Sequence, residues 1–333
     1  MLQGRLAAVT TATMLALTLS IRVAAQEKRE FTFGYDQPKT TGYGFAGDVF
    51  AKKLAELSGG TFIINQFPGA QLGQEPQMLQ KMRSGDIDFI LTSSANGATV
   101  SPQLGVMSIH YLFRDADHLA KAVASPELNK AIRQLVEQTV DGGHVLTLLT
   151  LGLRNMYGKQ SVTKVEDIAG KKIRVQATKT EDTMFPAYGA QTVHMPFGEV
   201  YTSLQTGVVD FAENGVNVYL SNKHYEVAPV MSMTEHEANN NLLWVSDKTW
   251  KGFTDTQRDW VEAAAAEVGR QEPPFALKLE RESADKLTRL GVKIIGGVDK
   301  SGFATKAQPL QDALAKELGP QAVEIVEIIR NVQ

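Results

Sequence analysis

Two arginines beside apolar residues are the side chains of this chain best suited to hold an anion. Arg154 follows the apolar run 146–153, where a buried charge needs an anionic partner or an edge open to solvent. Arg174 lies between Ile173 and Val175, on the opposite face of a strand-like segment. A lone arginine on such a face would more often be solvated. Because a guanidinium group keeps its charge and grips a carboxylate with two parallel hydrogen bonds, the pair predicts a site for a small anion.

The segment that must position Arg174 runs from residue 171 to residue 214 and is typical of a strand, a helix and a second strand. Phe197 opens the element after the first strand, and Asn214 closes the second strand. Open α/β sheets bind ligands outside the carboxyl ends of their strands. We therefore expect both arginines at the ends of strands that flank one loop region.

Strand-like and helix-like segments alternate along the chain, which indicates an α/β fold. Strands are expected at 30–35, 61–67, 87–92, 145–151, near 230, and at 242–246 and 292–295. Helices are expected at 44–57, 75–83, 116–124, 126–140, 309–318 and 321–330. A longer helix at 255–290 has to kink or restart at Pro273-Pro274, and the strand after it indicates that the chain visits both of its lobes.

A pattern that occurs twice predicts two similar α/β lobes. Residues 82–89 and 204–211 share the order apolar, any residue, Ser or Thr, Gly, any residue, Ile or Val, Asp, Phe. In each copy the glycine can end a helix in the left-handed conformation before the next strand begins. Such turns are common in α/β chains, so a chance match is the competing explanation.

The first 25 residues have the pattern of an export signal. A short positive start precedes the mostly apolar residues 6–21, and small residues at 23–25 offer a cleavage site near Ala25. We therefore expect the remaining chain in the periplasm. The 308 residues that would remain (333 − 25) exceed the roughly 250–300 residues at which single cores stop growing, which again favours two lobes. The chain has no cysteine, so it has no disulfide and no thiolate ligand.

Composition and motifs argue against several other classes of protein. The net charge is −3 at pH 7, and loss of the signal with Arg5 and Arg22 makes the rest more acidic, which disfavours nucleic acid and anionic membranes as partners. The six histidines show no metal-ligand spacing, and neither G-x-S-x-G nor H-E-x-x-H occurs. The segment Glu235-His236-Glu237 is interpreted as a solvated loop rather than the lining of a polar cleft.

A glycine pattern at 42–47, G-x-G-x-x-G, lies where a dinucleotide fingerprint would lie. The acidic residue that should follow about 20 positions later is missing, because Gln66-Phe67-Pro68 occupies that place. We expect no cofactor and no metal.

These residues resemble the solute-binding proteins of tripartite ATP-independent periplasmic (TRAP) transporters, the DctP-type family. The resemblance covers nearly all of the chain after the signal and is carried by Gln71-Leu-Gly73 with Glu75, Gly170-Lys-Lys-Ile-Arg174-Val, residues 195–210, Glu213-Asn214 and His224-Tyr-Glu-Val227. It implies two α/β lobes, a ligand cleft between them and a long helix that spans both. Lobe I would hold residues 26–151 plus about 240–279, and lobe II residues 152–239 plus about 280–333.

The resemblance also assigns roles to residues. It implies that Arg174 pairs with the substrate carboxylate, that Arg154 assists, and that Phe197 and Asn214 line the pocket. It also implies that Asp36, Glu75 and Ser93 are the corresponding pocket positions in the first lobe. The chain departs from the commoner family pattern at Gln176-Ala177, at Gly215 and at Ser93, and these departures leave the ligand open.

The function that the resemblance implies is capture of a small organic carboxylate, which is then handed to the membrane subunits of a permease. Asp36, Glu75 and Asn214 can hydrogen-bond to hydroxyl groups, which favours a uronate or aldonate, although two arginines could equally meet a C4-dicarboxylate. An exported lyase or isomerase for sugar acids is the alternative, but it needs a positioned base that the sequence does not name. A third interpretation makes a sensor or chemoreceptor the partner. A monomer is expected.

Overall fold

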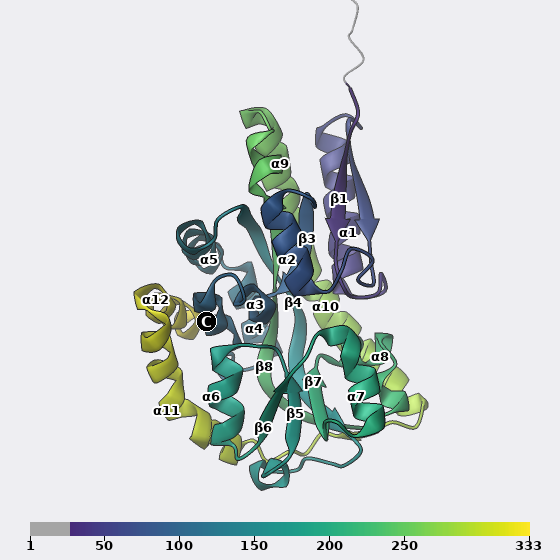
Figure 1. Cartoon of the computed structure of the whole chain (residues 1–333), viewed down its shortest axis with the longest axis vertical. Coiled ribbons are helices and arrows are strands. Elements are labelled where there is room, and N and C mark those ends of the chain that lie inside the picture. Colours follow the sequence, from purple (N-terminus) through teal and green to yellow (C-terminus); the bar gives the residue numbers. More distant parts are fainter. Residues whose placement is uncertain (1–26) are drawn as a thin grey trace, which may run out of the picture.

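The computed structural model describes residues 27–333, so the expected export signal lies outside the described residues. Two long antiparallel strands, β4 (Gly143–Gly158) and β8 (Val230–Ser246), run through the middle of the molecule (Figure 1). The sheet has the strand order β2-β1-β3-β8-β4-β7-β5-β6, and β9 (Lys293–Ile295) also pairs with β8. The order is therefore symmetric about the β8–β4 pair.

The three strands on each side of the β8–β4 pair belong to one α/β unit, so the molecule has two such units. One unit contains β1 (Arg29–Gly34), β2 (Phe62–Phe67) and β3 (Phe89–Ser93), where β1 runs parallel to both of the others. The other contains β5 (Lys172–Val175), β6 (Gln191–His194) and β7 (Phe211–Asn214), where β5 takes the central place. The expected two-lobed α/β class is confirmed.

The turn that the sequence repeats is the same structure in both units. Helix α2 (Glu75–Ser84) ends at Gly85 with φ 82°, and helix α7 (Val200–Thr206) ends at Gly207 with φ 76°. Both values lie in the left-handed region that glycine enters without steric cost. The strands that follow, β3 and β7, end at the two positions named from the sequence, Ser93 and Asn214.

Helix α10 (Asp255–Arg289) connects the two units, because it contacts α1 (Gly42–Leu57) and α4 (Ala116–Ala124) of one and α8 (Val216–Ser221) of the other. The expectation of a restart at the prolines is wrong. An interior proline costs one backbone hydrogen bond, but α10 packs on β4 across this stretch, with Glu272, Pro273 and Ala276 all buried. Tertiary packing therefore keeps the helix continuous.

The remaining helices complete the described fold. They are α3 (Ser94–Gly97), α5 (Pro126–Thr139), α6 (Lys179–Ala187), α9 (Asp247–Lys251), α11 (Ser301–Leu318) and α12 (Pro320–Asn331), with short 3-10 turns at Pro102–Ser108, Val165–Ile168, Phe197–Glu199 and His224–Glu226. Helix α11 begins at Ser301 rather than at Pro309, because Phe303 and Ala307 already pack in the core.

Each unit has its own apolar core next to a third cluster that they share. Aromatic rings from β1, β2, β3 and α1 fill the first, and Tyr157, Leu204 and Tyr219 belong to the second.

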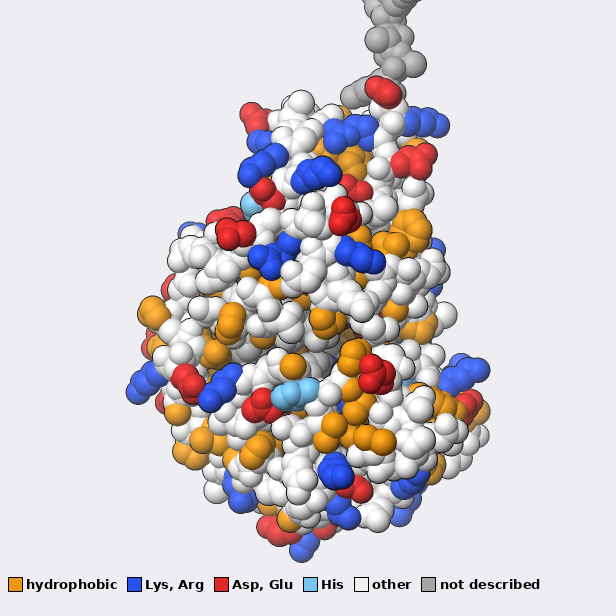
Figure 2. All heavy atoms as spheres, in the orientation of Figure 1, with side chains coloured by type: hydrophobic (Ala, Val, Ile, Leu, Met, Phe, Trp, Pro, Cys, Tyr) orange, Lys and Arg blue, Asp and Glu red, His pale blue; other side chains and the backbone are white. Residues whose placement is uncertain are grey.

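On the face shown in Figure 2, acidic and basic side chains are interspersed around the molecule. Within residues 27–333, none of the helices has the length and apolarity that crossing a bilayer requires.

Candidate functional site

A small cavity between the two units brings together every residue that the sequence singled out for the site. Its lining includes Asp36, Glu75 and Ser93 from one unit, Arg174, Phe197 and Asn214 from the other, and Arg154 from the central strand β4. Apart from Phe197, which is half-buried, these side chains are nearly inaccessible to solvent. The site is polar and lies deep in the molecule.

Arg174 is a buried cation without an acidic partner. It is only 2% exposed, while Ile173 and Val175 turn to the apolar core, as the alternation in β5 predicts. Its Nε and Nη2 atoms both donate to the carbonyl oxygen of Met195, at 3.1 and 2.9 Å, and its guanidinium carbon lies 5.8 Å from the centre of the Phe197 ring. Among residues 27–333, no carboxylate lies within 4.0 Å of this guanidinium group. Burial lowers the pKa of Arg174 from its ordinary value.

Arg154 has a different environment. The expectation that it ends a strand is wrong, since β4 continues to Gly158 and pairs Arg154 with Glu237 of β8. Its guanidinium forms a bidentate pair with Glu213 of β7, in which Nη2 donates to Oε1 at 2.6 Å and Nε donates to Oε2. Its Nε also lies 3.2 Å from a carboxylate oxygen of Glu237. The charge of Arg154 is therefore balanced inside the protein.

Glu75 anchors the acidic wall of the cavity. One of its oxygens accepts hydrogen bonds from the backbone and hydroxyl of Ser93, both at 2.8 Å, and from Asn96 Nδ2 at 2.7 Å. The other accepts from the Tyr43 hydroxyl at 3.1 Å. These donors fix the orientation of the carboxylate, because they reach both of its oxygens.

Asp36 lies close to this carboxylate and is held by a hydrogen bond from Gln37 Nε2, at 3.0 Å. Burial raises the pKa of Asp36 well above its ordinary value, and the charge of Glu75 raises it further. A protonated Asp36 can donate a hydrogen bond that an ionised one cannot. The acidic wall can therefore both accept and donate hydrogen bonds.

Several lining residues were missed by sequence reasoning, namely Gln37, Tyr43, Asn96, Gln176, Asn239 and Asn241. The last two carried a signal, because three consecutive asparagines are unusual in a strand. In β8, Asn239 and Asn241 face the cavity, whereas Asn240 points to the other side and donates to the carbonyl oxygen of Met107 at 2.9 Å. Asn239 Nδ2 also donates to Asn214 Oδ1 at 2.8 Å and so orients the amide that closes β7.

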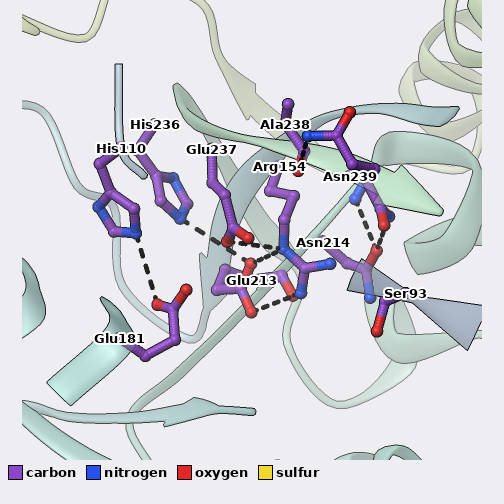
Figure 3. A network of polar contacts seen from close by, with 12 residues as sticks. Ser93, His110, Arg154, Glu181, Glu213, Asn214, His236, Glu237, Ala238 and Asn239 are labelled. Carbon is purple, nitrogen blue, oxygen red and sulfur yellow. Dashed lines mark hydrogen bonds and ion pairs between the residues drawn. The ribbon is translucent and has the colours of Figure 1, made fainter. Parts of the chain in front are cut away.

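The interpretation of residues 235–237 as a solvated loop is wrong. These residues lie within β8, which is one strand from Val230 to Ser246 rather than two short ones. His236 and Glu237 are 0% and 3% exposed, and they lie near Arg154 in the network that Figure 3 shows. Within this stretch only Glu237 pairs with β4, opposite Arg154, and residues 233–236 form an irregular bulge before the next pair, Ser232 with Met156.

Comparison with known proteins places the chain in a family. The model of bacterial extracellular solute-binding protein family 7, DctP, matches residues 33–317. The chain is similar to the 2,3-diketo-L-gulonate-binding periplasmic protein YiaO of Escherichia coli, with 26% identity over 99% of this chain and 100% of that protein.

Solved structures give the same result. A TRAP periplasmic solute-binding protein from Xanthobacter autotrophicus Py2 with bound β-D-galacturonate has a TM-score of 0.84 and 29% identity, over 91% of this chain and 100% of that one. One from Polaromonas sp. JS666 bound to D-erythronate has a TM-score of 0.86 and 25% identity, over 92% of this chain and 99% of that one. The chain thus belongs to the DctP family of bacterial extracellular solute-binding proteins, the binding subunits of TRAP transporters.

Proposed function

We propose that this chain captures a hydroxylated sugar acid, such as a uronate or an aldonate, in the cavity between its lobes and delivers it to the membrane permease of a TRAP transporter. The observation that carries the proposal is the state of Arg174, a buried guanidinium group with no protein carboxylate beside it. Its hydrogen bonds to Met195 use Nε and Nη2, and Nη1 has no partner among the described residues. A ligand carboxylate would balance this charge and accept from the free edge of the fork.

The rest of the lining favours hydroxyl groups over a second carboxylate. Arg154 contributes N–H groups to the same wall, but its charge is already balanced by Glu213, so the cavity offers one uncompensated cation rather than two. The cavity lining also holds the carboxyl groups of Asp36 and Glu75 and the amides of Asn214 and Asn239, which suit alcohols. The acids bound by the similar proteins, galacturonate and D-erythronate, combine one carboxylate with several hydroxyls.

Closure of two lobes around the acid would satisfy contacts that come from both sides. We infer lobe I at 26–151 plus about 240–279 and lobe II at 152–239 plus about 280–333. The symmetric strand order and the contacts of α10 with both units support this division. The family supports export to the periplasm with a signal cleaved near Ala25, and we expect a monomer.

Calorimetry with matched ligands tests the proposal. D-galacturonate and D-galactose differ in one carboxylate, while succinate has two carboxylates and no hydroxyl. We expect binding of a uronate or an aldonate such as D-erythronate, and none of galactose. Tighter binding of succinate than of every sugar acid would contradict the favoured ligand class.

The enzyme alternative is tested with the same acids. Each bound acid is incubated with the protein and recovered, and its mass and chromatographic retention are compared with those of the starting compound. A binding protein returns the acid unchanged, whereas a new compound that accumulates with time would support a lyase or an isomerase.

A further inference from the structure

Behind the ligand cavity, four buried side chains form a cluster that ligand capture does not use. His110, Glu181, His236 and Glu237 are each at most 3% exposed, and we call them the histidine–glutamate cluster. Figure 3 shows that they lie together beside Arg154. They come from the loop before α4, from α6 and from β8, so their spacing in the sequence gives no sign of the group.

The ligand atoms of this cluster converge. Donor atoms of His110, His236 and Glu237 all lie within 4.8 Å of one another. The Nε2 atom of His110 is also 3.4 Å from an oxygen of Glu181, so a second carboxylate lies beside one of these three donors. Two imidazoles and two carboxylates are enough to complete a four-coordinate site.

The two imidazole rings are oriented as metal-binding histidines are. Each uses Nδ1 for a hydrogen bond with a hydroxyl group, His110 with Tyr188 at 3.0 Å and His236 with Thr234 at 2.8 Å. Metal-binding histidines donate a hydrogen bond from the second nitrogen, so the Nδ1–H tautomer of both rings is the one that would leave Nε2 free for an ion. In both rings Nε2 is thus the atom left for a ligand.

The atoms that point into the cluster have no hydrogen-bond partners among residues 27–333. This is true of Nε2 in both histidines and of both oxygens of Glu181, whereas the oxygen of Glu237 without a hydrogen bond, Oε2, lies 3.2 Å from Arg154 Nε in an ion pair. Buried polar atoms without partners are costly, and lone pairs that face one another repel. A positive species between them removes both costs.

The local charges favour a divalent ion. The carboxylates of Glu181, Glu213 and Glu237 lie around a single guanidinium group, that of Arg154, which leaves two negative charges in excess when the histidines are neutral. Protons are the competing solution, since burial, and then the charge of Glu213, raise the pKa of Glu181 to about 8.

We propose that His110, Glu181, His236 and Glu237 bind one divalent transition-metal ion, with Zn²⁺ preferred. Imidazole nitrogens with carboxylate oxygens suit Zn²⁺ better than Mg²⁺ or Ca²⁺, which take oxygen ligands. The ion would join the loop before α4 to α6 and β8. It would also stabilise Glu237, which lies 3.2 Å from Arg154 in the wall of the ligand cavity.

The test uses the untagged protein and Co²⁺, whose visible absorption reports four-coordinate nitrogen and oxygen ligands. The protein is unfolded with a chelator, refolded with Co²⁺ and freed of excess ion, because a buried site fills as the chain folds. We expect one cobalt per chain, the absorption of a four-coordinate ion, loss of that absorption when refolding includes Zn²⁺, and a higher Tm than that of the metal-free protein. Wild-type protein without stoichiometric cobalt overturns the proposal and leaves protons as the neutralising species.

Matched variants locate the ion. His236→Gln is expected to lose the cobalt signal, whereas His194→Gln, which alters a half-exposed histidine paired with Asp182, is expected to keep it. If His236→Gln does not fold, Glu181→Gln replaces it in the comparison. Stoichiometric cobalt in the folded cluster variant, or equal loss in His194→Gln, would place the ion elsewhere and contradict the assignment.

Discussion

Arg154 and Glu213 form a buried bidentate ion pair between the neighbouring strands β4 and β7, with Nη2 and Oε1 2.6 Å apart. The next residue on β7, Asn214, lines the ligand cavity. The pair therefore joins the two strands directly behind the cavity wall. It also distinguishes the two cavity arginines, because Arg154 has its counter-ion in the protein and Arg174 does not.

Removing Glu213 should destabilise the protein strongly. Glu213→Gln leaves the guanidinium group of Arg154 buried without its main counter-ion, and breaking a buried pair in this way costs about 3–5 kcal/mol. Urea denaturation measures the change in the free energy of unfolding. Glu282→Gln, which breaks the exposed pair with Lys278, is the control and should change stability little. Equal effects of the two substitutions would mean that Arg154 does not depend on Glu213.

The residues of the cavity can be predicted from the sequence more readily than the partners that hold them. The glycine turns at residues 85 and 207 were readable because a left-handed helix end leaves a short local pattern. The division of labour between Arg154 and Arg174 was not, since it depends on Glu213 and Glu237 approaching from two other strands. The sequence pattern placed both arginines at strand ends, and the pairing of β4 with β7 and β8 shows that Arg154 instead lies inside its strand.

The affinity for the acid should fall as pH rises through the pKa of Asp36. Burial, and then Glu75, raise this pKa, so Asp36 keeps its proton at pH values where an ordinary aspartate is ionised. Ionisation at higher pH adds a negative charge to a cavity that must accept a carboxylate. We expect a loss of about tenfold, equivalent to about 1.4 kcal/mol.

Asp36→Asn isolates this effect, because the amide has a similar shape and no titration. Calorimetry on both proteins from about pH 5 to pH 9, where a sugar acid stays ionised, should give a falling affinity for the wild type and a flatter profile for the variant. Identical pH profiles would show that the charge of Asp36 does not oppose the ligand.

Glu272 should make the folded protein less stable as pH rises. It is fully buried in α10, accepts one hydrogen bond from the Thr150 backbone, and burial raises its pKa from 4.5 to about 8. The folded state then holds a proton that the unfolded state releases, so its contribution is complete below pH 4.5 and is lost as pH rises towards 8. The slope is at most about 1.4 kcal/mol per pH unit for one group.

Glu272→Gln keeps the acceptor for Thr150 and removes the titration. Urea denaturation at a series of pH values in this window should give a smaller slope for the variant than for the wild type, and Glu282→Gln should keep the wild-type slope. Part of the slope should remain in Glu272→Gln, because burial also raises the pKa of Glu280 to about 8. An unchanged slope would contradict the buried, protonated state of Glu272.

The errors of sequence reasoning about secondary structure share a physical cause. Two separate strands were expected, near Val230 and at 242–246, with Glu235-His236-Glu237 in a solvated loop between them, because charged side chains are usually solvated. In the fold the polar residues from Glu235 to Asn241 form the middle of β8, where Arg154, Asn214 and Met107 supply their partners. Such partners are distant in the sequence, so local propensity could not predict that the strand continues.

The central claim is that Arg174 binds the carboxylate of the ligand, and calorimetry on Arg174→Ala tests it most directly. The acid that the wild type binds in the ligand panel is titrated into the wild type, Arg174→Ala and Arg174→Lys, with thermal unfolding as a check on the fold. The account predicts that Arg174→Ala stays folded and loses about 2–5 kcal/mol of binding free energy. Arg174→Lys, which lacks the planar fork, is expected to lose less than Arg174→Ala but to stay weaker than the wild type. A folded Arg174→Ala protein that binds the acid with wild-type affinity would contradict the account.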